Sequence, residues 1–218
     1  MIELIDIPTE QTTAATDLIL AVLALSFIFY LRQVRDYEAR RKEIWSWVFE
    51  LIALVGVLGT VIHGFKIPEG TRYVFWQAVY LALGLVVSLF VVGVIYDLKG
   101  YVASWMIIVV LTVGICFFVV TLLVPDSFLI FIVYEALALL FAISAYTWLA
   151  IKRKLVGSWL IAIGLSISII AAIIQTTETV QITFIWKFDH NGLFHIVQLV
   201  GLLFIMVGLN FSFKRPLV

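Results

Sequence analysis

The chain has few of the residues that usually build a soluble enzyme. Only 13% of its 218 residues are charged and 64% are hydrophobic, whereas a soluble domain carries roughly 25% charged residues. The net charge is zero, so nothing indicates nucleic acid as a partner. A single cysteine excludes an internal disulfide framework and a cysteine-based metal cluster. These shortages predict a polytopic membrane protein.

Proline is also scarce, and all four prolines fall outside the long hydrophobic stretches. A helix needs about 20 mostly apolar residues to cross a bilayer. We therefore predict an all-α membrane protein, a single domain over residues 1–218 that forms a seven-transmembrane helix bundle. The approximate bounds of its helices are 14–31, 44–64, 73–96, 101–124, 128–151, 155–175 and 190–213. Unbroken segments without an evident repeat argue against a transporter.

Lysine and arginine are divided unevenly between the two sets of predicted loops. Of the fourteen such residues, three, Lys66, Arg72 and Lys187, fall on one side, and eleven fall on the side that holds the C-terminus. Cytoplasmic loops are enriched in these residues. We therefore expect the N-terminus outside and the C-terminus inside. The first 17 residues lack lysine and arginine, which is atypical of a signal peptide, so we expect them to be retained.

All three histidines are expected at one membrane depth. The second segment ends at His63, and the last segment begins at His190 and continues through His195. The predicted topology places these ends in the outer layer, beside polar residues such as Gln77 and Gln175. Neutral imidazole is a common metal ligand, and catalytic zinc sites typically use three protein ligands. The sequence therefore predicts a polar site on the extracytoplasmic side, with zinc as its candidate cofactor.

The spacing of the last two histidines limits how they can share this site. Helix positions five residues apart are separated by about 140°, so His190 and His195 cannot both face inward from a regular helix. His190 fits only in or before the first turn, or where a π-bulge shifts the register. Asn191 stands four residues before His195 and is its natural partner on one face. Histidines near helix ends can also be simple interfacial residues, so both alternatives stay open.

Three carboxylates elsewhere call for separate interpretation. Intramembrane carboxylates are unfavourable in lipid and usually face the bundle interior. We expect Glu50 to be structural, and Glu135 either to join the histidine site or to cross-link helices. Asp97 is expected to be solvated in a short loop.

The connection over residues 177–189 alternates apolar and polar residues from Val180 to Phe184. Such a period is closer to that of a strand than to that of a helix. It favours an extended flap lying across the outer mouth of the bundle. The alternative is an interfacial loop anchored by Trp186.

Two short segments resemble motifs of a known superfamily. Gly59-Thr60-Val61-Ile62-His63 and Asn191-Gly192-Leu193-Phe194-His195 resemble the Ser-x-x-x-His and His-x-x-x-His motifs of the seven-helix membrane hydrolases that include alkaline ceramidases and the progestin and adipoQ receptors. The helix count and expected orientation are similar to those of the ceramidases. The resemblance implies zinc on three ligands, here His63, His195 and either His190 or Asn191. It also implies attack on an amide or ester bond of a membrane lipid.

The sequence departs from this pattern at three positions. Gly59 stands at the serine position with Thr60 beside it, Gln77 stands in place of an aspartate, and Asn191 in place of a histidine. The residues that the resemblance implies in catalysis are therefore Thr60, Gln77 and Asn191.

These departures leave two functions open. One is a zinc-dependent, ceramidase-like membrane hydrolase. The other is a non-catalytic receptor or lipid-binding protein of the same fold. Sparse intramembrane charge argues against a channel, and the lack of lysine in residues 192–213 excludes a retinal-linked pump. Heme held by His63 and His195 is disfavoured because the second histidine pair expected of a di-heme bundle is absent. The oligomeric state is not indicated.

Overall fold

The computed structural model describes residues 3–34, 39–124, 128–177 and 179–214. Within these residues the chain forms seven helices, each long and apolar enough to cross a membrane. The predicted all-α, seven-helix class is therefore confirmed, and the chain is an integral membrane protein. The helices are α1 (Pro8–Gln33), α2 (Ala39–Gly64), α3 (Glu69–Lys99), α4 (Ser104–Leu123), α5 (Phe128–Ile151), α6 (Ser158–Thr176) and α7 (His190–Phe213).

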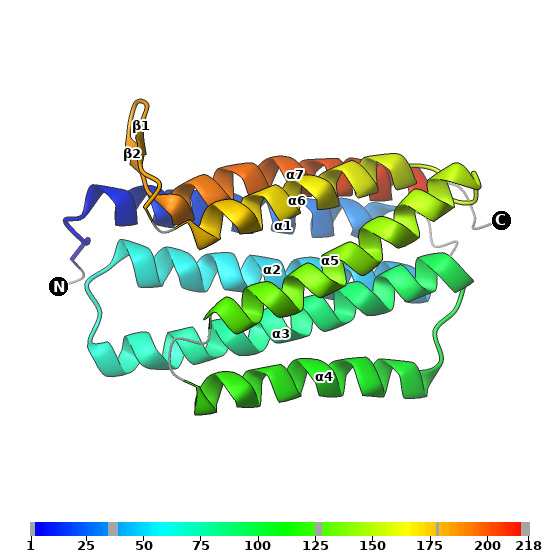
Figure 1. The fold of residues 1–218 in the computed structure, drawn as a ribbon, viewed down its shortest axis with the longest axis horizontal. Coiled ribbons are helices and arrows are strands. Elements are labelled where there is room, and N and C mark those ends of the chain that lie inside the picture. Colours follow the sequence, from blue (N-terminus) through cyan, green and yellow to red (C-terminus); the bar gives the residue numbers. More distant parts are fainter. Residues whose placement is uncertain (1–2, 35–38, 125–127, 178, 215–218) are drawn as a thin grey trace.

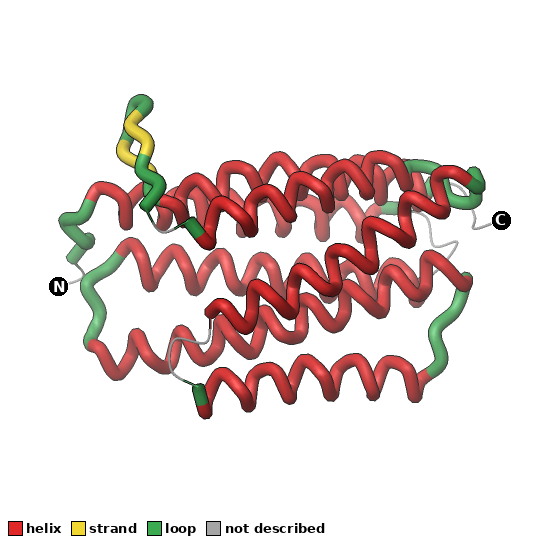
Figure 2. Tube along the Cα trace, viewed as in Figure 1, coloured by secondary structure: helices red, strands yellow, loops and turns green. Residues whose placement is uncertain are grey.

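Helices that follow one another in sequence run in alternating directions, and all consecutive pairs except α4 and α5 pack extensively side by side (Figure 1). Helix α7 returns to α1, α5 crosses obliquely from α3 to α6, and α4 packs mainly on α3. A short hairpin of β1 (Ile182–Thr183) and β2 (Lys187–Phe188) stands out from the bundle at the end where α1 begins (Figure 2). We call this end the hairpin end and the other the C-terminal end.

Helix α1 begins at Pro8, two turns before the predicted residue 14. The expectation that Pro8 lies outside the helices is therefore wrong. A proline is well suited to the first helical position because its missing N–H would have no partner there. The hydropathy criterion missed these two turns because they are polar. Thr13 is nevertheless buried, and the Gln11 side chain donates a hydrogen bond to the Ile5 carbonyl oxygen at 2.7 Å.

Glycines bring α6 and α7 into direct backbone contact. A Cβ atom at Gly164 would lie 2.5 Å from the carbonyl oxygen of Gly201, and one at Gly201 would lie 2.8 Å from that of Gly164. Seven residues along each helix, Gly157 and Gly208 meet in the same way. Small residues at such contacts are typical of helix association in membranes, where close packing replaces the hydrophobic effect. We call these four glycines the glycine seam.

A buried polar cluster ties four helices together toward the C-terminal end. Arg41 of α2 donates to Asp97 of α3, with Nε 2.5 Å from Oδ1. The Tyr146 hydroxyl donates to Asp97 Oδ2 at 2.7 Å, and Arg41 Nη2 donates to Ser212 Oγ at 2.8 Å. Asp97 is only 2% exposed. Our expectation of a solvated Asp97 is therefore wrong, since its charge is paired inside the bundle.

The hairpin corrects the prediction of a flap. The backbone is extended in two short strands joined by a turn at residues 184–186, with Ile182 paired to Phe188 and Thr183 to Lys187. The hairpin projects away from the bundle, however, and does not cross its mouth (Figure 1). Its base is held where the Thr12 hydroxyl donates to the Lys187 carbonyl oxygen at 2.7 Å. Its tip is therefore free to contact its surroundings, with Phe184 and Trp186 largely exposed.

Candidate functional site

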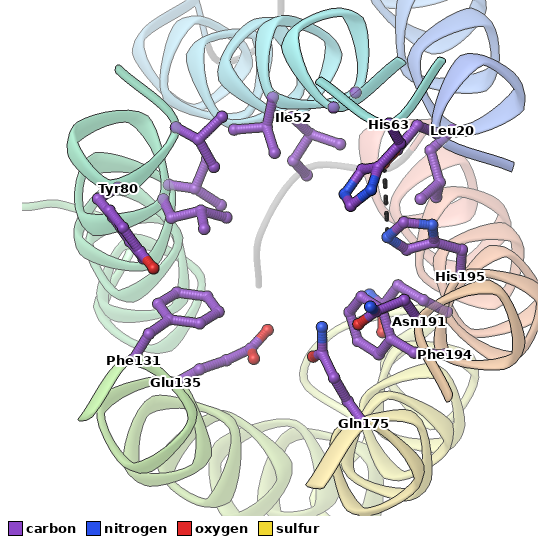
Figure 3. A pocket seen from close by; sticks show the side chains of 18 of the residues that line it. Leu20, Ile52, His63, Tyr80, Phe131, Glu135, Gln175, Asn191, Phe194 and His195 are labelled. Carbon is purple, nitrogen blue, oxygen red and sulfur yellow. Dashed lines mark ion pairs between the residues drawn. The ribbon is translucent and has the colours of Figure 1, made fainter. Parts of the chain in front are cut away.

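A cavity of about 430 Å³ lies inside the bundle, in the half toward the hairpin end. Six of the helices line it, and α4 contributes none of its lining residues among those that the structure describes. Its lining includes apolar residues such as Leu20, Ile52 and Leu202 and polar side chains of α1, α2, α5, α6 and α7. Figure 3 shows part of this lining. A cavity of this size and mixed lining is typical of sites for small ligands.

His63, at the end of α2, is oriented by a hydrogen bond to a carboxylate. Its Nδ1 lies 2.7 Å from Oε2 of Glu10 in α1. Because a carboxylate accepts hydrogen bonds, Nδ1 of His63 carries a proton and donates it to Glu10. The ring also contacts Trp76 edge to face, with 5.7 Å between ring centroids. The sequence predicted His63 but missed Glu10, which lay outside the predicted bounds of the first helix.

His195 of α7 joins two residues of α1. Its Nδ1 lies 3.0 Å from Thr16 Oγ1, and the Thr16 hydroxyl donates to the Thr13 carbonyl oxygen at 2.8 Å. Nδ1 therefore donates to Thr16, and Nε2 is left facing Asp17 Oδ1 at 3.4 Å. A neutral imidazole would present a lone pair to the carboxylate. The contact is thus favourable only when one proton lies between His195 and Asp17, and together they carry no net charge.

Asp17 also explains an unusual feature of the second helix. A Cβ atom at Gly59 would lie 2.6 Å from Asp17 Oδ2, and one at Gly56 would lie 2.7 Å from the Asp17 carbonyl oxygen. The serine of the motif that this segment resembles would therefore collide with the carboxylate from α1. Glycine at this position makes room for Asp17. An aspartate within a predicted membrane segment is itself a signal of a functional site, and it could have been found in the sequence.

Five buried polar atoms around this cavity have no hydrogen-bond partner. Buried polar atoms in folded proteins are nearly always hydrogen-bonded. Among the described residues, seven buried side-chain atoms have none, and five of the seven belong to residues that line the cavity. They are Asp17 Oδ2, Glu135 Oε2, Gln175 Oε1, His190 Nδ1 and Gln198 Oε1. Figure 3 shows Glu135 and Gln175 pointing into the cavity. The unsatisfied polarity of the bundle is thus concentrated here.

The histidines predicted from sequence all reach this cavity. His63, His190 and His195 line it together with Asn191. Asp189 caps α7 by accepting a hydrogen bond from the Gly192 amide at 2.9 Å. His190 is therefore the first residue of the helix, which is the position that the i, i+5 spacing requires.

Two other predicted residues lie elsewhere. The Thr60 hydroxyl donates to the Gly56 carbonyl oxygen at 2.7 Å, within its own helix. Gln77 has a buried Oε1 atom without a partner. Neither residue is among those that line the cavity, over the part of the chain that the structure describes. Catalytic roles for Thr60 and Gln77 stay predictions, and their positions give them no contact with a ligand in the cavity.

The side chains do not fit a three-ligand zinc site as they lie. Among the described residues, no group of three or more histidine, cysteine, aspartate or glutamate side chains is placed to hold a metal ion. Nε2 of His195, which would have to bind the metal, faces Asp17. Asn191 supplies only an amide where the superfamily motif has a histidine. We therefore derive no chemical step through zinc.

Comparison with known proteins gives a family but no function. No curated protein and no solved structure matches the chain. Residues 12–212 match the model of a family of unknown function, DUF6962. The match spans all seven helices and every residue of the site except Glu10. The chain therefore belongs to the DUF6962 family.

Proposed function

We propose that this protein binds an amphiphilic molecule drawn from the membrane, as a non-catalytic receptor or lipid-binding protein. The observation that carries the proposal is the convergence of five unpaired buried polar atoms on one cavity. Leaving a buried polar group without a partner costs about 1–3 kcal/mol. A ligand or ordered water that supplies the missing hydrogen bonds recovers this free energy, so the site favours an occupant with a polar head.

The apolar part of the cavity wall determines the chemical character of the rest of the ligand. Leu20, Ile52 and Val86 face the same space as the polar atoms, so a bound molecule must satisfy both. Burying apolar surface contributes roughly 25 cal/mol per Å², which favours a hydrocarbon chain over a second polar group. A molecule with one polar head and one apolar chain matches this division.

We also place the hairpin end outside the cytoplasm. The support is the uneven distribution of lysine and arginine, since Lys152, Arg153 and Lys154 follow α5 at the C-terminal end, whereas Lys66 and Lys187 are the basic residues of the loops at the hairpin end. The ligand would then reach the cavity from the outer half of the bilayer. Cysteine labelling of single-cysteine variants in intact cells tests this orientation.

Filling the cavity tests the binding function. Leu83 lines the cavity from α3, and Leu83→Trp would occupy much of its space. Leu54→Trp on α2 is the matched control, because Leu54 is 46% exposed on the outer surface of the bundle. We expect native mass spectrometry of the purified protein to detect a bound amphiphile in wild type and in Leu54→Trp but not in Leu83→Trp. Equal ligand content in all three proteins would contradict the proposal.

A zinc-dependent hydrolase acting on a lipid amide or ester is the second candidate. One observation favours it: three histidines line a single cavity, and a carboxylate holds Nδ1 of His63, as carboxylates do behind metal-binding histidines. Zinc, when bound, would supply a polarising charge and an activated water. Elemental analysis tests this candidate: about one zinc per chain in wild type and none in His63→Ala would support it. Metal-free wild-type protein would exclude it.

A further inference from the structure

The charge of the cavity indicates what kind of polar head it accepts. Asp17 and Glu135 line it, and no lysine or arginine does so within the described part of the chain. Asp17 is compensated by His195 across the 3.4 Å contact. Glu135 has neither a hydrogen bond nor an ion pair with any described residue, and its Oε2 atom is buried. A buried carboxylate without a counter-charge is strongly unfavourable, so Glu135 is the group that a cationic ligand would most stabilise.

The cavity that holds Glu135 also contains hydrogen-bond acceptors without partners. Gln175 of α6 is only 9% exposed, and its Oε1 atom has no partner. In Figure 3 its side chain and that of Glu135 point into the cavity from neighbouring helices. Asp17 Oδ2 is a further unpaired acceptor. An ammonium group has three donors and no acceptor, and it therefore matches both the charge and the hydrogen-bonding character of this wall.

Aromatic rings complete the same wall. Trp76, Tyr80, Phe131 and Phe194 all line the cavity, and Figure 3 shows Tyr80 and Phe131 on the side of Glu135 and Phe194 on the side of Gln175. The face of an aromatic ring attracts an organic cation, by about 2 kcal/mol or more when the cation is desolvated. Aromatic faces combined with a carboxylate are therefore a suitable environment for an ammonium group and an unsuitable one for an anion.

We propose that the ligand is an amphiphile whose head is a protonated amine, held by Glu135 and Gln175 among these rings, with its hydrocarbon chain along the apolar wall. The inference rests on the proposed binding function and names the chemical class of its ligand. A neutral alcohol would satisfy the acceptors but leave the carboxylate without a counter-charge. A carboxylic acid would add a second negative charge beside Glu135.

A series of ligands with one chain length and different heads tests the inference. The full chain, purified in a nonionic detergent, would be titrated with decylamine, decanol and decanoate, with binding followed through tryptophan fluorescence because Trp76 lines the cavity. We expect decylamine to bind saturably and at least about tenfold more tightly than decanol, a ratio that corresponds to about 1.4 kcal/mol. The Leu83→Trp protein is the control for amine that enters the detergent micelle and not the cavity. We expect no saturable binding to this variant.

Substitutions of single residues then show where the amine head of the ligand binds. Glu135→Gln should weaken decylamine binding by about tenfold or more and should weaken decanol binding by a clearly smaller factor, since only the amine carries a charge. Glu50→Gln is the matched control, because Glu50 lies on α2 in an exposed ion pair with Arg32, 3.6 Å away, and it should behave like wild type. Gln175→Leu should weaken decylamine binding, and Gln77→Leu, which removes a similarly unpaired amide away from the cavity, should not.

The outcomes separate the two proposals. Saturable binding of decanol or decanoate as tight as that of decylamine would overturn the amine inference and leave the binding function standing. Saturable binding of none of the three would overturn both. The comparison of heads on wild-type protein decides this even if Glu135→Gln fails to fold.

Discussion

Replacing Gly59 by alanine should disturb both the packing of α1 against α2 and the cavity. The new Cβ would lie 2.6 Å, 2.7 Å and 2.8 Å from the three terminal atoms of the Asp17 carboxyl group. Nonbonded carbon contacts are optimal at roughly 3.5–4.0 Å, so the carboxylate must move by about 1 Å. That movement separates Asp17 Oδ1 from His195 Nε2, which are already 3.4 Å apart.

The expected effect on stability combines two opposing contributions. Overpacking of a close contact destabilises by about 1–3 kcal/mol. Alanine is a better helix former than glycine by about 1 kcal/mol. The net loss should therefore reach up to about 2 kcal/mol. Gly64→Ala, at the end of the same helix, is the control, because its Cβ would lie at an ordinary 3.4 Å from the nearest atom, in Ala14.

Reversible unfolding in mixed micelles measures these changes. A double-mutant cycle gives the sharper test, since Asp17→Ala removes the atoms that collide with the methyl group. We expect Gly59→Ala to be destabilising in wild type and nearly neutral, or stabilising, in Asp17→Ala, with a coupling free energy of about 1 kcal/mol or more. Additive effects of the two substitutions would refute the reasoning that Gly59 exists to accommodate Asp17.

Three further predictions concern contacts that hold the helices together. Asp97→Asn removes the buried carboxylate that pairs with Arg41 and accepts from Tyr146, and it should lower the free energy of unfolding by about 3–5 kcal/mol. Glu50→Gln at the exposed pair should change it by less than about 1 kcal/mol, and equal effects would contradict the buried cluster. Gly201→Val should overpack the glycine seam and destabilise by about 1–3 kcal/mol in the same assay, and a neutral result would mean that α6 and α7 are not in backbone contact. Glu10→Gln should remove the charged acceptor of His63 and cost about 1–2 kcal/mol, a loss that should vanish in the His63→Ala background.

The number and class of the helices were predictable because hydropathy over about 20 residues is a local property. The start of α1 was not, because its first two turns carry Glu10, Gln11, Thr12 and Thr13, whose burial depends on contacts with other segments. Asp97 was misassigned for a similar reason. Its partner Arg41 lies 56 residues away in sequence, and no local pattern indicates that pairing.

The site was predictable in part. The shared depth of His63 and His195 follows from counting helices, and both residues do line one cavity. The carboxylates that contact them come from α1, and no local pattern indicates that this helix lies between α2 and α7. Thr60 was chosen because it follows the position of a motif serine, but its hydroxyl binds its own helix. Side-chain direction within a helix depends on the packing of its neighbours and was not available from the spacing alone.

The glycine seam determines which part of the cavity can adapt. With their backbones in contact, α6 and α7 cannot approach further or rotate about one another without a clash, so Gln175 and His195 keep a constant separation. Gly56 and Gly59 fix α1 against α2 in the same manner. Each of these two helix pairs therefore behaves as a rigid unit. A change in cavity volume that admits ligands of different width must therefore come from α3 and α5, the remaining helices that line it, or from movement of one pair relative to the other.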